Sequence, residues 1–150
     1  IMAGLTQHGA CEEIFARRLR WASDLASGAG ICLCVEPLNK RDFPGYLVPD
    51  TTTALRILEK VGRPDSCRLQ LDLYHLQVSE GDLSENIRRL LPHTAHVQLA
   101  NPPGRNEPGL GEVHFSPLLK LLDRLGYEGH VGCEYRPSTT TEQSLAWAAP

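Results

Sequence analysis

The sequence lacks three features that would each set the class of the protein. It has no run of roughly 20 consecutive apolar residues, which argues against a transmembrane helix. It has no basic excess: 15 Lys and Arg stand against 18 Asp and Glu, and the formal charge of −3 argues against a nucleic-acid partner. Residues 1–13 lack a basic segment followed by an apolar one, so no signal peptide is predicted.

The charge density of a disordered chain is also missing. With 41% hydrophobic and 22% charged residues over 150 positions, we expect one folded domain spanning residues 1–150. The five cysteines are odd in number and follow no framework spacing, which favours a reducing compartment and a cytoplasmic protein. Cys32 and Cys34 lie on one face of a predicted strand, where we expect a buried pair of small side chains rather than metal ligands.

What the sequence does contain is a strand-then-helix pattern that occurs four times. Apolar residues at three- and four-residue spacing predict helices over 11–27, 51–61, 82–91, 116–125 and 142–148. Short apolar runs predict strands over 31–36, 68–75, 95–100 and 130–135. This alternation predicts an α/β fold with a parallel sheet, either doubly wound or part of a (β/α)₈ barrel. No glycine-rich nucleotide-binding motif follows a strand, which argues against the nucleotide-binding version.

Each predicted strand has, at its carboxyl end or just inside it, a polar residue that a purely structural strand does not need. These residues are Glu36, Asp72, Gln98 and Glu134. One of them alone indicates a cap or a salt bridge, but one in each βα unit predicts that all four meet at the carboxyl-end edge of the sheet, where barrel enzymes assemble their sites. Three converging carboxylates repel one another unless a cation lies among them. An all-oxygen ligand set favours Mg²⁺ or Mn²⁺.

Two further residues follow these strand ends. His75 lies three residues after Asp72, and Arg105 lies in the glycine-rich loop over 101–112. Both are placed to hold an anionic or polyhydroxylated substrate. The alternatives are a surface histidine and a solvated loop arginine.

The residues around the strand ends resemble the C-terminal half of the hydroxypyruvate isomerase family, in the xylose isomerase-like TIM barrel superfamily. The resemblance is carried by VEPLNKRDFPGY, LQLDLYHLQ, HVQLANPPGRNEPGLGE and GHVGCEYRP, and the opening IMAG resembles the end of the preceding strand. Ketose epimerases of the superfamily typically have histidine where Gln98 stands, so Gln98 favours the isomerase branch. Asn101 stands where the family often has an acidic residue.

The resemblance implies a (β/α)₈ barrel, of which this chain covers about the C-terminal half with four βα units. It implies that the divalent ion is bound by Glu36, Asp72, Gln98 and Glu134. It implies that Glu36 and Glu134 are also the catalytic acid/base pair, and that His75 and Arg105 contact the substrate. The implied activity is that of an isomerase, which interconverts hydroxypyruvate and tartronate semialdehyde by glutamate-mediated proton transfer through an enediolate.

Three alternatives stay open. The first is an isomerase or epimerase of a longer 2-oxo acid or ketose on the same scaffold. The second is metal-dependent phosphodiester cleavage, against which the charge of −3 and the shortage of histidine ligands argue. The third is a non-catalytic half-barrel that binds a partner or itself. Because four strands leave two open edges, we expect two copies to pair around a two-fold axis, as a homodimer or a larger oligomer.

Overall fold

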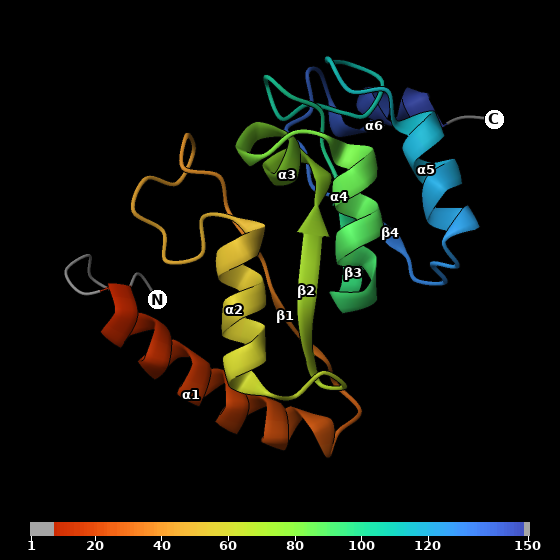
Figure 1. Cartoon of the computed structure of the whole chain (residues 1–150). Helices are drawn as coiled ribbons and strands as arrows, with labels where there is room; N and C mark the ends of the chain where they lie inside the picture. Colours follow the sequence, from red (N-terminus) through yellow and green to blue (C-terminus); the bar gives the residue numbers. More distant parts are fainter. Residues whose placement is uncertain (1–7, 149–150) are drawn as a thin grey trace.

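The sheet of the protein has four parallel strands in the order β1-β2-β3-β4 (Figure 1). The structure is a computed structural model, and it describes residues 8–148; the predicted strand end at residues 1–4 lies outside them. The strands are β1 (Leu33–Val35), β2 (Cys67–Asp72), β3 (Thr94–Leu99) and β4 (Val131–Cys133). The predicted α/β alternation is confirmed, and the architecture is half of a (β/α)₈ barrel.

The helices between the strands begin and end close to their predicted bounds. They are α1 (His8–Ser27), α2 (Thr51–Val61), α4 (Leu83–Leu90), α5 (Phe115–Arg124) and α6 (Thr141–Ser144), with 3₁₀ turns η1 (Leu91–His93) and η2 (Leu145–Ala148). Helix α2 shows why: Asp50 accepts a hydrogen bond from the Thr53 amide at 2.8 Å, and Gly62 ends the helix in the left-handed conformation. No described helix is long and apolar enough to cross a membrane.

One predicted boundary is wrong, and the error lies at the site. The strand predicted over 68–75 ends at Asp72, and α3 (Leu73–Ser79) follows immediately. The Asp72 carboxylate accepts a hydrogen bond from the Tyr74 amide at 2.8 Å, so it caps the new helix. This early turn places His75 in the first turn of a helix directly beyond the strand end.

The two faces of the sheet differ in what covers them. Apolar residues of the strands are buried in one core with residues of α2, α4 and α5, and α2 and α4 lie in front of the sheet in Figure 1. The intervening residues, such as Cys34, Gln70 and Gln98, point to the opposite face. Cys34 is exposed there and Cys32 is exposed as well, so the predicted buried cysteine pair is wrong. No described layer covers this opposite face, which in a complete barrel is the interior.

Candidate functional site

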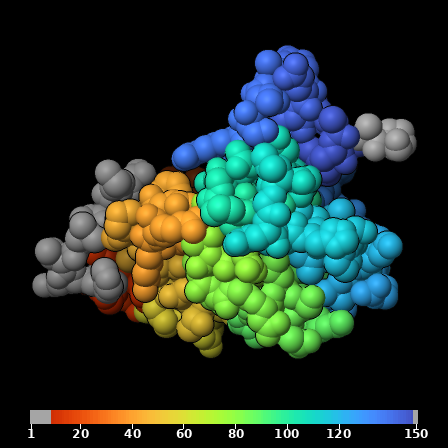
Figure 2. Space-filling view, turned by 90° about the horizontal axis from the view of Figure 1, so that it is seen from above, coloured from red at the N-terminus to blue at the C-terminus, as the bar shows by residue number. Residues whose placement is uncertain are grey.

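The topology brings the four strand-end residues to one edge of the sheet. Asp72 is the register partner of Gln98, and Gln98 is the partner of Gly132. Glu36 follows β1 directly, and Glu134 follows β4. Figure 2 looks onto this end of the molecule, where the loop over 39–50 (orange) and the loop over 101–112 (teal) lie side by side. Their contact includes a 3.5 Å hydrogen bond from the Arg41 guanidinium to the carbonyl of Pro103.

Glu36 and Asp72 form a partly buried pair of carboxyl groups. Asp72 is 2% exposed, and Oε1 of Glu36 is buried without a hydrogen-bond partner among the described residues. Burial, together with repulsion from Asp72, raises the pKa of Glu36 to about 7. Burial likewise raises the pKa of Asp72 to about 6. An orphaned carboxylate oxygen beside a second buried carboxyl is an arrangement that a bound cation stabilises, so these residues fit a divalent ion.

The raised pKa values make the fold less stable as the pH rises when no cation is bound. Between pH 4.5 and about 7 the unfolded chain loses the Glu36 proton while the folded chain keeps it, so unfolding becomes more favourable. Asp72 acts in the same direction between pH 3.8 and about 6. His75 acts oppositely, because burial lowers its pKa from 6.5 to about 4, and acid therefore favours the unfolded chain. The destabilisation from the two carboxyl groups is complete above about pH 7.

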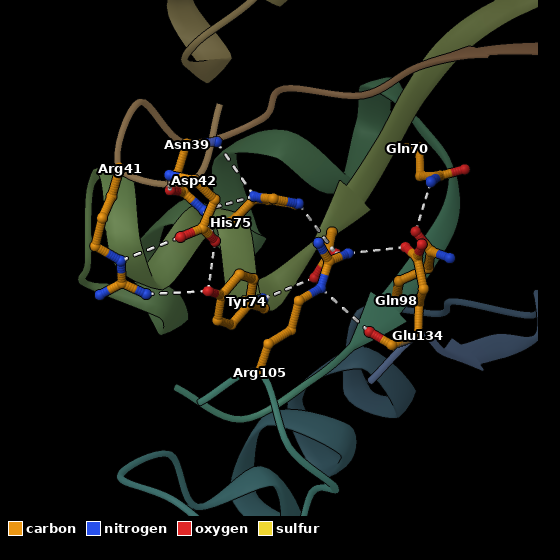
Figure 3. A network of polar contacts seen from close by, with 10 residues as sticks. Asn39, Arg41, Asp42, Gln70, Tyr74, His75, Gln98, Arg105 and Glu134 are labelled. Atoms are coloured by element: carbon orange, nitrogen blue, oxygen red, sulfur yellow. Dashed lines mark hydrogen bonds and ion pairs between the residues drawn. The ribbon is translucent and has the colours of Figure 1, made fainter. Parts of the chain in front are cut away.

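Arg105 connects the ends of two strands (Figure 3). Its Nη2 lies 2.9 Å from Oε2 of Glu134 and 3.3 Å from Oδ2 of Asp72, and its guanidinium lies 5.1 Å above the Tyr74 ring. The Arg105 backbone has a φ of +58°, rare for a residue with a side chain, and the Arg136 amide donates to its carbonyl at 2.7 Å. With a side chain only 13% exposed, Arg105 is not a solvated loop arginine.

Gln98 has a neighbour that the sequence analysis missed. Its Oε1 accepts a hydrogen bond from Nε2 of Gln70, and the Gln70 amide also lowers the pKa of Glu36, against the larger effect of burial. Gln70 stands two positions before Asp72 in β2 and therefore on the same side of the strand. That period of two is the sequence feature that points to Gln70.

The loop after β1 supplies further polar contacts that the sequence analysis did not single out (Figure 3). The Tyr74 hydroxyl donates to Oδ2 of Asp42 at 2.5 Å, and the Arg41 guanidinium donates to the Tyr74 oxygen at 3.0 Å. Asn39 contacts both Asp42 and His75. The loop and the first turn of α3 are therefore held together at the edge of the site.

Asn101 organises the loop over 101–112. Its side-chain nitrogen donates to the carbonyls of Pro108 and Val113 at 2.9 Å each, and its oxygen accepts from the Val113 amide at 2.9 Å. A carboxylate has no N–H group to make the two donated bonds. The amide of Asn101 therefore makes loop contacts that a carboxylate at this position could not make.

The described site thus holds two groups of predicted residues. Glu36, Asp72 and His75 each offer an atom, and these atoms lie within 4.8 Å of one another. Glu134 lies outside that group, is 59% exposed, and joins it through Arg105. The predicted roles of these residues stay predictions.

Comparison with known proteins places this site in a family. The xylose isomerase-like TIM barrel family matches residues 2–150. The hydroxypyruvate isomerase of Escherichia coli K12 is 37% identical over 153 residues, which are 99% of this chain and 59% of that protein. The 2-oxo-tetronate isomerase of Cupriavidus necator is 36% identical over 154 residues, which are 100% of this chain and 59% of that protein.

A solved structure agrees with these relatives. A protein of Brucella melitensis described as an AP endonuclease, family 2, superimposes with a TM-score of 0.91 and 42% identity, over 97% of this chain and 57% of that one. The chain therefore spans a little over half the length of the relatives it matches. On the family match and the shared half-barrel architecture together, the chain belongs to the xylose isomerase-like TIM barrel family.

Proposed function

We propose that the chain carries the catalytic residues of a divalent-metal-dependent isomerase that interconverts hydroxypyruvate and tartronate semialdehyde. The observation that carries the proposal is the buried, unpartnered oxygen of Glu36 beside Asp72 at the carboxyl ends of consecutive parallel strands. The relatives whose names include hydroxypyruvate isomerase support this choice of reaction. A charge of −3 and only one histidine among the predicted site residues favour it over phosphodiester cleavage.

The strand-end residues would hold the ion, namely Glu36, Asp72, Gln98 and Glu134. Their carboxylate and amide oxygens suit Mg²⁺ or Mn²⁺. When bound, the ion supplies Lewis-acid polarisation of the substrate oxygens.

Two glutamates at opposite strands of the sheet suit a proton shuttle. One removes a proton from the carbon that bears the hydroxyl group, and the other delivers a proton to the neighbouring carbonyl carbon, while a second proton moves from the hydroxyl oxygen to the former carbonyl oxygen. Glu36, with a pKa of about 7, is poised to be either acid or base near neutral pH. Glu134 follows the far strand, and its Oε2 lies 2.9 Å from Nη2 of Arg105.

His75 and Arg105 are the groups that we propose bind the substrate. The Arg105 guanidinium presents a planar set of N–H donors that matches a carboxylate such as that of hydroxypyruvate. His75 is buried beside the loop after β1, and its Nε2 lies 3.8 Å from Oδ2 of Asp72, the carboxylate with which Arg105 also pairs. The substrate carboxylate would then be held at the Arg105 side of the site, and the reacting carbons at the glutamates.

A substrate comparison tests the assignment. We expect turnover of hydroxypyruvate to exceed that of 2-oxo-tetronate, which is one CHOH unit longer, by at least about tenfold in kcat/KM, because an added group must find room among fixed side chains. The measurement is product formation from each compound at matched concentration with Mg²⁺ or Mn²⁺ present. A preference for the longer acid or for a ketose would contradict hydroxypyruvate as the substrate and would support the alternative, an isomerase or epimerase of a longer 2-oxo acid or ketose.

We also propose that two copies of the chain pair into a dimer. The sheet ends in β1 on one side and β4 on the other, and all its strands are parallel, so two copies related by a two-fold axis can join β4 to β1 twice and close eight strands. Helix α1 adds an exposed apolar stripe of Ile14, Trp21 and Leu25, which are 52%, 62% and 62% exposed.

Light scattering measures this directly. The expected mass is about twice the 16.6 kDa of one chain. A clean monomer at micromolar concentration would contradict the dimer.

A further inference from the structure

We propose that Asn39 fixes His75 in the tautomer that carries its proton on Nε2, so that His75 acts as a hydrogen-bond donor to a substrate oxygen and not as a metal ligand. The identity of the accepting oxygen rests on the proposed function. The tautomer itself follows from the contacts around the His75 ring. Asn39 is therefore a positioning residue, which acts through His75.

The orientation of the Asn39 amide is fixed by its neighbours. Its Oδ1 accepts a hydrogen bond from the Asp42 backbone amide at 2.9 Å, and its Nδ2 donates to Oδ2 of Asp42 at 3.1 Å. Exchanging the two atoms would place an oxygen against a carboxylate and an NH₂ group against an N–H donor. The nitrogen of Asn39 is therefore the atom that faces His75.

Two N–H donors then converge on one nitrogen of the His75 ring (Figure 3). The Asn39 backbone amide lies 3.2 Å from Nδ1, and Nδ2 of Asn39 lies 2.7 Å from it. Both residues are 1% exposed, so water does not compete for this position. Nδ1 must accept, because a proton on it would face two other donors. A neutral imidazole with a bare Nδ1 carries its proton on Nε2.

The ring is also held against rotation. Tyr74 packs edge-on to His75 with ring centroids 5.2 Å apart, and Phe43 lies tilted at 5.8 Å. A flip of the His75 ring would place a ring carbon where Nδ1 now lies. The backbone amide of Asn39 and the N–H of its side chain that faces the ring would then both lose this acceptor. The charged neighbours that influence the ring are Asp72, Asp42 and Arg105.

Nε2 therefore presents its N–H to the site. This nitrogen is buried without a hydrogen-bond partner among the described residues, and its near neighbour Oδ2 of Asp72 lies 3.8 Å away, beyond hydrogen-bond length. A metal ion needs the lone pair that the proton occupies. One polar atom each of Glu36, Asp72 and His75 lie within 4.8 Å of one another, but of these three residues only the two carboxyl groups are available to bind a metal ion. The N–H of His75 is then free to donate to an oxygen atom of the substrate.

Nitrogen NMR of the 150-residue chain without metal or substrate tests the tautomer. Long-range proton–nitrogen correlation at neutral pH should show the His75 ring with Nδ1 unprotonated and Nε2 protonated. The chain has six histidines, so loss of one set of signals in His75→Gln assigns the ring. Protonated Nδ1 in the wild-type chain would overturn the proposal.

Substitution of Asn39 supplies the matched test. Asn39→Asp keeps the shape but places an acceptor against Nδ1, so the proton should move to Nδ1 and reverse the nitrogen shifts. If that variant does not fold, Asn39→Ala decides: only the backbone amide of residue 39 then donates to Nδ1, so the Nε2–H tautomer should lose population to the Nδ1–H tautomer and the nitrogen shifts should move towards each other. An unchanged Nε2–H pattern in the folded Asp variant, or in the Ala variant when the Asp variant is unfolded, would contradict the role of Asn39.

Metal affinity separates this inference from the proposed function. Titration with Mn²⁺ alone, followed by electron paramagnetic resonance, should give the same affinity for His75→Gln as for the wild-type chain. A loss of more than about 100-fold, beyond what removal of an outer-shell neighbour costs, would identify His75 as a ligand and overturn the proposal. If the expected tautomer is seen in a chain with no isomerase activity, the proposed function fails and the tautomer assignment stands.

Discussion

We expect Glu36→Gln and Glu134→Gln each to abolish the proposed isomerase turnover, with a loss of about 10³-fold or more in kcat, as removal of a positioned acid or base does. Glutamine keeps the shape of the side chain and one oxygen but cannot accept and return a proton at neutral pH. Because the proposed mechanism has the two glutamates act on successive halves of the same proton transfer, the double variant should be little worse than either single one.

The control for this result is a glutamate that the site does not use. Glu85 on α4 is 72% exposed and pairs only with Arg88 of the same helix among the described residues, so Glu85→Gln should retain full activity. Circular dichroism of all the variants checks that the fold is kept. Turnover within about tenfold of wild type in Glu36→Gln or Glu134→Gln would contradict the acid/base assignment.

Addition of Mg²⁺ or Mn²⁺ should stabilise the chain strongly, and more at pH 8 than at pH 5. At an ion concentration 100 times the dissociation constant the gain is about 2.7 kcal/mol in free energy of unfolding. The pH dependence follows from Glu36 and Asp72, whose pKa values of about 7 and about 6 leave both largely protonated at pH 5, where the ion must displace their protons. Thermal unfolding with EDTA and with each ion measures the effect.

Two variants make that measurement specific. Asp72→Asn keeps an oxygen to cap α3 but loses the carboxylate, so the fold should persist while the response to the ion falls sharply. Glu36→Gln should also lose the response, yet it should be more stable than wild type in EDTA at pH 8, since a partly buried charge is removed. An equal response to the ion in wild type and both variants would place the metal elsewhere.

The sequence predicts the arrangement of the strand ends because that arrangement depends on chain order. One polar residue per βα unit, at the end of each apolar run, suffices to place Glu36, Asp72, Gln98 and Glu134 at one edge once the strands are parallel and consecutive. The helix bounds follow equally from local capping, as with Asp50 and Gly62 at the two ends of α2.

What the sequence did not predict depends on contacts between distant segments. The apolar run through Leu73 and Tyr74 continues the strand pattern, and only the capping bond of Asp72 shows that the chain turns there. The strand pattern around Cys34 is that of a buried strand, but Cys34 points to the face of the sheet that no described layer covers and is therefore exposed. The contact of Asn39 with His75 joins residues 36 positions apart, which no local pattern encodes.

Turnover of hydroxypyruvate by the 150-residue chain, measured together with the mass of the active species, decides whether these strand ends form a divalent-metal-dependent isomerase site. Size-exclusion fractions are weighed by light scattering and assayed with EDTA, with Mg²⁺ and with Mn²⁺. We expect activity in the fraction with the mass of about two chains, abolished by EDTA and restored by either ion. Activity that survives complete removal of divalent ions, or none in a folded, metal-loaded dimer, would contradict it.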